Sequence, residues 1–249
     1  MTVVISSLIH ALLCLLIVSF VIADDSEPIP YAYPNEFSIQ FVCNITKGAN
    51  VNPEFPVEGT MYYNWNIESQ RIDHGAGAYE CTEFYNHSGP CTLYFNPKGL
   101  FRYLHGNLTN SQLRCCLDME DIGASPPDWA DNAGYNYEGI VVDDYSNQQA
   151  YQFSYAEGAH LSRDLIDTKN AMLLFTFEKE ETGGLQDFHY DATTMKVGSQ
   201  NDQLFEIPPT CYESCTTSTS LYQKHRYIFH LLKNRGNGNV DTLTDQKYN

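Results

Sequence analysis

Few of the titratable side chains in this 249-residue chain stand in a pattern that could support catalysis. His74 follows Asp73 directly, and a histidine base beside a carboxylate is the arrangement that supports hydrolysis. No nucleophile in a recognisable setting accompanies the pair. The sequence has no G-x-S-x-G elbow, no HExxH zinc motif and no phosphate-binding G-x-x-x-x-G-K-[ST] loop. We therefore expect that this protein is not an enzyme.

Loop carboxylates offer a second chemistry, the binding of calcium. Asp118, Glu120 and Asp121 lie within four residues of one another, and carboxylate oxygens are the ligands that calcium prefers. They do not match an EF-hand loop, and a solvated acidic surface would have the same composition. The sequence leaves two interpretations open, a calcium site at these residues or an acidic surface.

Aromatic side chains at strand spacing point to the binding of an apolar ligand. Alternation places Met61, Tyr63 and Trp65 on one face of a strand, and it does the same for the aromatic residues of 151–155. Such residues fill a core at least as often as they line a cavity. The candidate pocket residues are Tyr63, Trp65, Phe153 and Phe175.

The amino-terminal residues predict export from the cell. Leu8–Ile22 is nearly all apolar, and Val21 and Ala23 fit the small-residue rule for cleavage, so residues 1–23 are expected to be a signal peptide. The segment before it has no lysine or arginine, which departs from the usual pattern. No later stretch has the roughly 18 apolar residues that a membrane span requires. We expect a secreted, extracellular protein without stable membrane insertion after cleavage.

Sequons and cysteines agree with an oxidising, extracellular compartment. Asn44, Asn86 and Asn107 each begin an N-x-[ST] acceptor for an N-glycan. Seven cysteines follow the predicted signal peptide, and because seven is odd, at least one thiol is free or pairs between chains. They are Cys43, Cys81, Cys91, Cys115, Cys116, Cys211 and Cys215.

These residues must be positioned by a fold that is mostly β. Alternation and aromatic enrichment predict strands at 37–41, 61–65, 93–95, 135–142, 151–155 and 173–177. Only 158–169 and the end of the chain have a helical pattern. Many short strands without strand-helix alternation predict an all-β protein with minor α, either an antiparallel sandwich or an open half-barrel.

Charge divides the chain into regions. The formal net charge of -17 argues against a nucleic-acid partner, because affinity for phosphates begins with a basic surface. Residues 24–36 are predicted to be an acidic linker rich in proline and tyrosine, and 37–215 the β domain. Residues 216–249 form a basic tail, in which Leu221–Lys233 could be a short helix.

Four pieces of the sequence resemble the ependymins and ependymin-related secreted glycoproteins. The most specific is the last, in which Phe205, Pro208 and Pro209 precede a cysteine. The resemblance is remote and covers roughly residues 37–215. This chain departs from the family in its doubled Cys115–Cys116, its additional cysteines and its basic tail. The matching pieces are Met61–Trp65 with Ser69–Ile72, which resembles the Gln-Arg turn after the family's aromatic strand, together with Cys115–Cys116, Tyr135–Val142 and Leu204–Cys211.

The resemblance implies a disulfide-bonded glycoprotein with two stacked antiparallel sheets, similar to bacterial lipoprotein carriers, around an apolar pocket. Proteins of this kind look like binders of lipids or other hydrophobic molecules, often dimeric and associated with calcium. The resemblance also implies that Cys211 pairs with Cys115 or Cys116. We expect Cys81 and Cys91 to pair locally, and the links of Cys43 and Cys215 stay open.

A structural role is the alternative function. An acidic glycoprotein with an odd cysteine could be a subunit of an extracellular matrix, coat or filament. The arm Tyr31–Glu36 or the segment Leu221–Lys233 would then pack on the next subunit. The partners expected from the sequence are therefore a hydrophobic small molecule or lipid, and further copies of the chain in a homo-oligomer that could be filamentous.

Overall fold

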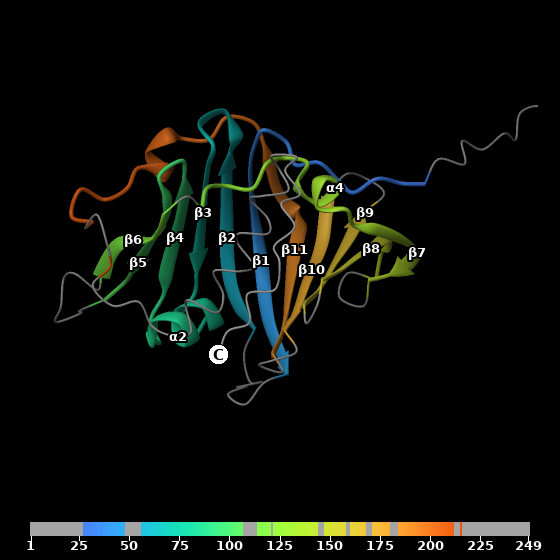
Figure 1. Ribbon diagram of the computed structural model, residues 1–249, viewed down its shortest axis with the longest axis horizontal. Coiled ribbons are helices and arrows are strands. Elements are labelled where there is room, and N and C mark those ends of the chain that lie inside the picture. The colour runs from blue at the N-terminus through green and yellow to red at the C-terminus, as the bar shows by residue number, and fades with distance from the viewer. Residues whose placement is uncertain are drawn as a thin grey trace, which may run out of the picture.

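Strands dominate the part of the chain that the computed structural model describes, residues 27–47, 56–106, 114–120, 122–143, 147–157, 160–167, 171–179, 184–211 and 215. Within it, eleven strands form one antiparallel sheet in the order β6-β5-β4-β3-β2-β1-β11-β10-β9-β8-β7 (Figure 1). The strands are β1 (Glu36–Lys47), β2 (Val57–Asn64), β3 (Ser69–His74), β4 (Cys91–Asn96), β5 (Gly99–Leu104), β6 (Cys115–Glu120), β7 (Asn136–Val142), β8 (Gln149–Glu157), β9 (His160–Asp167), β10 (Ala171–Lys179) and β11 (Gly184–Val197).

The helices in the described residues are short. They are the α-helices α2 (Tyr79–Tyr85) and α4 (Trp129–Ala133) and the 3-10 helices η1 (Trp65–Ile67) and η2 (Asp202–Phe205). Figure 1 shows α2 and α4 at opposite ends of the strands. None of the helices in this part of the chain is long and apolar enough to cross a membrane.

The sheet is continuous and curls at one end. Ala150 of β8 packs with Ala192 of β11, although β9 and β10 lie between these strands in the sheet order. The strands on the two sides of this bend can therefore face each other as layers do. The expected all-β fold with minor α and an open antiparallel arrangement is confirmed, and its two expected sheets are joined as one.

Local assignments differ from the sequence expectation at three places. The helical pattern at 158–169 is misleading, because β9 (His160–Asp167) is a strand paired with β8 on one side and β10 on the other. Trp65 does not continue its strand but begins η1. Ser69–Ile72, which the resemblance presents as a turn, belongs to β3, and the turn before it is η1.

The edge strand β6 is fixed on both of its faces. Neighbouring residues of a strand point to opposite faces, so the adjacent Cys115 and Cys116 project on opposite sides of β6. Cys115 is bonded to Cys211 and Cys116 to Cys215, and the Cys215 N–H donates to the Leu117 carbonyl of β6 at 3.0 Å. We call this arrangement the β6 clasp.

Candidate ligand-binding face

One face of the sheet collects the large apolar side chains. Directly opposed residues of an antiparallel ladder project to the same side. Phe37 is opposed to Tyr63, Ile39 to Met61, and Phe41 to Gly59, which is in turn opposed to His74. We call this side the aromatic face and the other side the opposite face. The aromatic side chains that define it, Phe37, Phe41, Tyr63 and Phe153, are all at most 3% exposed.

Residues near α4 and the amino-terminal segment cover one end of the aromatic face. The ring of Tyr33 lies 5.3 Å from that of Phe37, 5.7 Å from that of Tyr63 and 6.3 Å from that of Trp129 in α4. The hydroxyl of Tyr63 donates to the Ser125 carbonyl at 2.8 Å. The beginning of the described chain is therefore packed onto its own sheet.

Helix α2 covers the other end of the aromatic face. A disulfide joins Cys81 of α2 to Cys91 of β4, and both sulfurs are buried with Ala78 and Leu104 in one cluster. The Asn86 that ends this helix adopts a left-handed backbone conformation, with φ of 50°. A seven-residue helix has little stability alone, so the disulfide and this cluster hold it in place.

Between the two covers lies a group of aromatic rings around Phe41, which we call the Phe41 group. The ring of Phe41 lies 5.6 Å from that of Phe188, and 5.7 Å from those of Tyr190 and His74. Gly59 makes room for it, since a Cβ atom there would overlap the Phe41 ring. Phe41 is 3% exposed, whereas Phe188 and Tyr190 are only half-buried. Apolar surface thus remains accessible beside a buried ring.

His74 is the polar member of the Phe41 group. Its side chain is 2% exposed, and its Nδ1 lies 3.5 Å from Oε2 of Glu80 in α2. Within the described residues, neither ring nitrogen of His74 has a hydrogen-bond partner. The pairing of His74 with Asp73 that a hydrolase would need does not occur, because adjacent strand residues point to opposite faces.

A buried ion pair lies at the far end of α2. Arg102 of β5 is 4% exposed, its Nη1 lies 3.8 Å from Oδ1 of Asp118, and its guanidinium lies 4.5 Å from the centroid of the Tyr85 ring. Burial raises the pKa of the Asp118 carboxyl, while Arg102 and a hydrogen bond from Tyr85 act against that shift. This environment ties Asp118 to a cation of the protein itself.

The calcium site expected at Asp118, Glu120 and Asp121 is not assembled in the described residues. Asp118 is paired with Arg102, Glu120 is exposed, and Asp121 lies outside the described residues. In the part of the chain that the structure describes, no group of three or more histidine, cysteine or acidic residues is placed to hold a metal ion. Calcium binding therefore stays a prediction.

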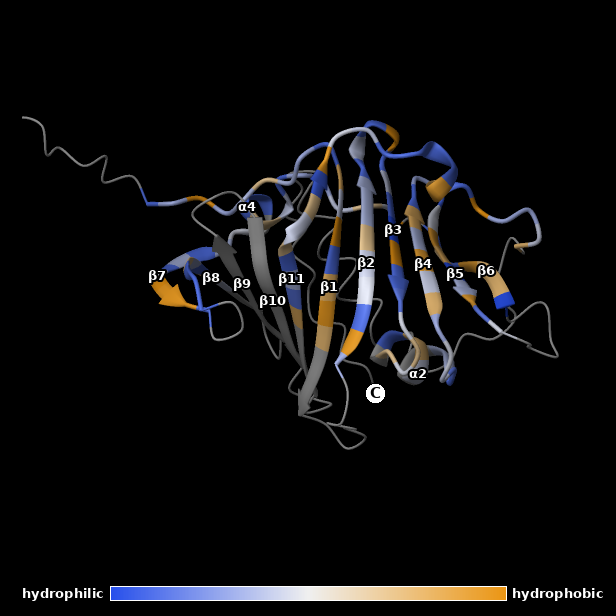
Figure 2. Cartoon of the chain, turned by 180° about the vertical axis from the view of Figure 1, so that it is seen from behind, coloured by the Kyte–Doolittle hydropathy of each residue, from blue (hydrophilic) through white to orange (hydrophobic). Residues whose placement is uncertain are grey.

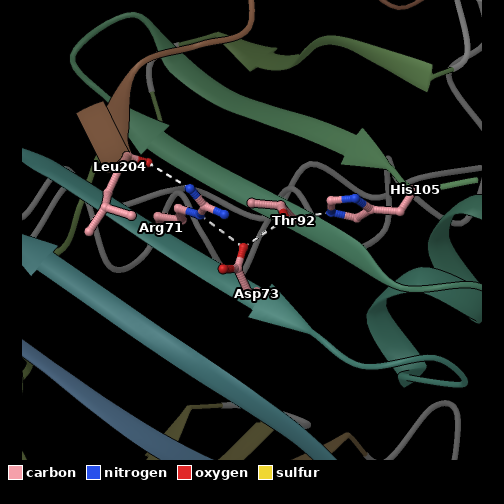
Figure 3. A network of polar contacts seen from close by, with 5 residues as sticks. All are labelled: Arg71, Asp73, Thr92, His105 and Leu204. Carbon is pink, nitrogen blue, oxygen red and sulfur yellow. Dashed lines mark hydrogen bonds and ion pairs between the residues drawn. The ribbon is translucent and has the colours of Figure 1, made fainter. Parts of the chain in front are cut away.

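A polar network occupies the opposite face (Figure 3). Arg71 donates from Nε to Oδ1 of Asp73 at 2.9 Å and from Nη1 to the Leu204 carbonyl at 3.1 Å. The Thr92 hydroxyl donates to Oδ1 of Asp73 at 2.7 Å, and Nε2 of His105 lies 2.9 Å from the same hydroxyl oxygen. The network thereby ties η2, and the segment leading to the β6 clasp, to strands β3 and β4.

The hydrogen bonds in this network do not run in the direction that would activate a nucleophile. Because the single hydroxyl proton of Thr92 goes to Asp73, His105 must donate to Thr92 rather than accept from it. An activated hydroxyl would instead donate to the histidine base. Burial lowers the pKa of His105, which favours the neutral ring that this arrangement uses. These hydrogen bonds are consistent with a structural role for the network.

Of the four predicted pocket residues, the structure describes the side chains of three. Tyr63 and Phe153 are both 0% exposed, and they lie on β2 and β8, with four strands of the sheet between them. Trp65 is half-buried and stacks on Tyr63 with ring centroids 6.5 Å apart. The side chain of Phe175 lies outside the described residues. Tyr63 and Phe153 are core residues.

The predicted disulfides are confirmed where the expectation was definite. Cys81 pairs with Cys91, and Cys211 pairs with Cys115, one of the two partners that the family resemblance implies. The link left open for Cys215 goes to Cys116. Cys43 takes no part in these three bonds and is 4% exposed on the aromatic face.

Of the three predicted glycosylation sites, the structure describes the side chain of one. Asn86 is exposed at the end of α2, where a glycan would have room. The side chain of Asn44 and all of Asn107 lie outside the described residues. Glycosylation itself stays a prediction at all three sites.

Comparison with known proteins gives likeness of fold alone. No protein-family model and no curated protein matches the sequence. The ependymin family is therefore not shown. An uncharacterised conserved protein of Thermus thermophilus is similar in structure, with 12% identity and a TM-score of 0.47 over 73% of this chain and 91% of that one.

Two further solved structures are similar at lower scores. The MucA/MucB complex of Pseudomonas aeruginosa has 13% identity and a TM-score of 0.38, covering 71% of this chain and 56% of that one. A domain described as an outer membrane lipoprotein-sorting protein of Vibrio parahaemolyticus has 7% identity and a TM-score of 0.30, covering 68% and 89%. At these identities the likeness describes the strand arrangement and no shared activity.

Sequence reasoning missed the members of the Phe41 group. It places Phe41 in a strand but not among the candidate contacts, and it does not single out Phe188 or Tyr190. A signal was present, because Phe188 and Tyr190 alternate around His189 as strand residues of one face do. That these rings meet Phe41 depends on the pairing of β1 with β11, strands that are far apart in the sequence.

Proposed function

We propose that this protein is a secreted, disulfide-bonded binding protein that holds an apolar ligand against the Phe41 group without performing chemistry on it. The observation that carries the proposal is the half-buried state of Phe188 and Tyr190 beside the buried ring of Phe41. Half-buried rings on the covered side of a sheet are a surface that an apolar molecule can complete, because burying apolar area is favourable.

The compartment is part of the proposal. Three disulfides agree with an oxidising environment, since such bonds persist in secreted proteins and are rare in reducing cells. The predicted signal peptide and sequons support secretion and glycosylation. The resemblance to ependymins supports a hydrophobic ligand, and we propose membership of that family on the residues given above.

Fluorescence of a neutral apolar probe, N-phenyl-1-naphthylamine, tests the proposed site. The purified full-length protein is expected to bind the probe, and Phe188→Ala or Tyr190→Ala to weaken binding about tenfold, because each removes an aromatic contact surface. Tyr103→Ala is the matched control, as it removes a half-buried ring from the opposite face. Absence of probe binding by the unmodified protein, or equal weakening by all three variants, would show that the proposal is wrong.

A further inference from the structure

Accessible apolar surface on the aromatic face extends beyond the Phe41 group. Ile72 lies on β3, an interior strand of the sheet, yet its side chain is only half-buried. It packs on the same buried cluster as Tyr190, and this cluster includes Ile39 and Met61. Ile39 is opposed to Met61 and Met61 to Ile72, so the three side chains project to the aromatic face. An apolar molecule on the Phe41 group can therefore continue along the sheet to Ile72.

Gln70 is the polar side chain beside this surface. It precedes Ile72 by two residues in β3, so both side chains project to the aromatic face. On the neighbouring strands it is opposed to Tyr63 and Phe95, which are at most 6% exposed. Gln70 itself is half-buried, whereas His74 in the same strand is 4% exposed. Part of the Gln70 side chain is thus open to a ligand, and the protein encloses His74.

The Gln70 amide has hydrogen-bonding capacity to offer such a molecule. Its Nε2 donates to Sδ of Met61 at 3.1 Å, and a thioether sulfur is only a weak acceptor. A carboxamide has two N–H donors and an oxygen that accepts, so this bond uses one donor. The second N–H and the oxygen suit a ligand group that accepts and donates at once. Between the buried rings of Tyr63 and Phe95, such hydrogen bonds are shielded from water and gain strength.

A charged head group suits this place less well. A charge that leaves water needs a partner of opposite sign, which the uncharged Gln70 does not supply. Arg102 of β5, a cation on the same face, is 4% exposed and paired with Asp118. The formal charge of -17 on the chain repels an anionic ligand in addition. These considerations favour an uncharged molecule.

We infer that the ligand is an uncharged fatty amide, whose carboxamide pairs with that of Gln70 and whose chain runs over Ile72 to the Phe41 group. Three interstrand spacings separate β3 from β11, which amounts to about 14 Å, and a long alkyl chain covers that distance. The inference rests on the proposed function, since it names the ligand class of the same face. It makes Gln70 the residue that determines head-group specificity, and no covalent bond is made or broken.

Competition against N-phenyl-1-naphthylamine on the full-length protein tests the choice of head group. The competitors are dodecanamide, methyl dodecanoate and dodecanoate, which carry a donor with an acceptor, only an acceptor, and a charge. We expect dodecanamide to compete about tenfold better than the ester, the factor that one hydrogen bond contributes, and better than the anion. Equal competition by amide and ester, or preference for dodecanoate, would overturn the inference. Binding of the probe itself, and its loss in Phe188→Ala or Tyr190→Ala, would still decide the proposed function separately.

Variants of Gln70 test whether this residue makes the distinction. Gln70→Leu is expected to bind the neutral probe as before but to lose the preference for amide over ester. Gln70→Glu places a carboxylate there, so it is expected to prefer dodecylammonium to dodecanamide, because a poorly solvated carboxylate favours a cationic partner. Gln40→Glu is the matched control, since Gln40 is exposed on β1 and points to the opposite face. A Gln70→Leu protein that folds, judged by its melting temperature, and still prefers the amide would overturn the inference, as would a Gln70→Glu protein that prefers dodecanamide.

Discussion

Tyr63 lies deep in the aromatic face, and its hydroxyl gives it a defined role. The side chain is 0% exposed, packs against Phe37 with ring centroids 5.1 Å apart, and donates to the Ser125 carbonyl. The hydrogen bond links β2 to the segment before α4. Tyr63 therefore ties a cover to the sheet, which is a different task from contacting a ligand.

Replacement of Tyr63 by phenylalanine should change stability in a manner that depends on pH. Near neutral pH, Tyr63→Phe is expected to cost about 1 kcal/mol, the value of one hydrogen bond. Burial, and then the Asp128 carboxylate, raise the pKa of Tyr63 above its ordinary value. The folded protein thus keeps a proton that the unfolded chain loses above about pH 10. The stability contributed by that proton is complete below this pH and falls as the pH rises further.

Tyr63→Phe has no hydroxyl at this position and therefore does not lose stability in this way. The difference in unfolding free energy between the unmodified protein and Tyr63→Phe should shrink from pH 9 to pH 11. The expected slope is on the order of 1 kcal/mol per pH unit above pH 10. Urea unfolding followed by circular dichroism at several pH values measures it. A constant difference across that range would contradict the assignment of the buried hydroxyl.

At the level of elements, the adjacent cysteines of β6 illustrate how strand geometry fixes connectivity. Because Cys115 and Cys116 point to opposite faces, one carboxy-terminal segment can bond to both only if Cys211 and Cys215 lie on either side of the strand. The same geometry gives β6 a covered edge, since Cys215 donates to the Leu117 carbonyl. Unpaired edges invite association, and a covered edge avoids it.

Removal of one half of the β6 clasp should release this edge. The Cys116→Ala/Cys215→Ala variant is expected to lose on the order of 3–5 kcal/mol, because the bond closes a loop of 99 residues. Hydrogen exchange should show faster exchange of the β6 amides, with little change in β1 and β2. The Cys81→Ala/Cys91→Ala variant serves for comparison, and it should loosen α2 instead. Faster exchange throughout the sheet in the first variant would argue against a local role for the clasp.

The sequence indicated most strands of this sheet but not its helices or its order. Strands such as 37–41 and 93–95 alternate clearly, so local pattern was sufficient. Helix α2 was missed because it has only seven residues and is held by the Cys81–Cys91 bond, a tertiary contact. The segment 160–167 has a helix-like spacing of apolar residues, and pairing on both sides outweighs that local preference.

The candidate site was less predictable than the fold. Tyr63 and Phe153 were correctly expected to point inward, but alternation cannot distinguish a filled core from an open surface. The neighbours of Phe41 come from strands β2, β3 and β11, and their meeting depends on a register that no local pattern contains. His74 and Asp73 are adjacent in the sequence, but they project to opposite faces of β3.

For the molecule as a whole, the two ends of the sheet differ. Within the described residues β7 pairs only with β8, and it has no lysine or proline to protect its free side. Ile140 is 60% exposed and Val142 is 53% exposed, and Figure 2 shows orange at the free end of the strand. Its one carboxylate, Glu138, accepts a hydrogen bond from the Ser154 hydroxyl. Exposed apolar side chains on a strand with an unpaired side favour association with another copy.

Lysines on this edge should prevent such association. Sedimentation velocity of the unmodified protein is expected to show association that increases with concentration, and Ile140→Lys/Val142→Lys to reduce it at least tenfold in affinity, because two buried apolar contacts become like charges facing each other. Val197→Lys is the matched control, as Val197 is 66% exposed on an interior strand. A protein that sediments as a monomer at every concentration would contradict this expectation.

The β6 clasp also has a consequence for biosynthesis. Cys115 and Cys116 precede their partners by 96 and 99 residues, whereas Cys81 and Cys91 are only ten residues apart. A chain that enters an oxidising compartment with its amino end first can close the short loop early, but the adjacent thiols must wait for the last part of the sheet and the segment after it. A product that ends before Cys211 would carry both thiols on an uncovered strand, ready to form wrong disulfides. Whether Cys115 and Cys116 are both oxidised to their native partners therefore depends on whether synthesis has reached Cys215.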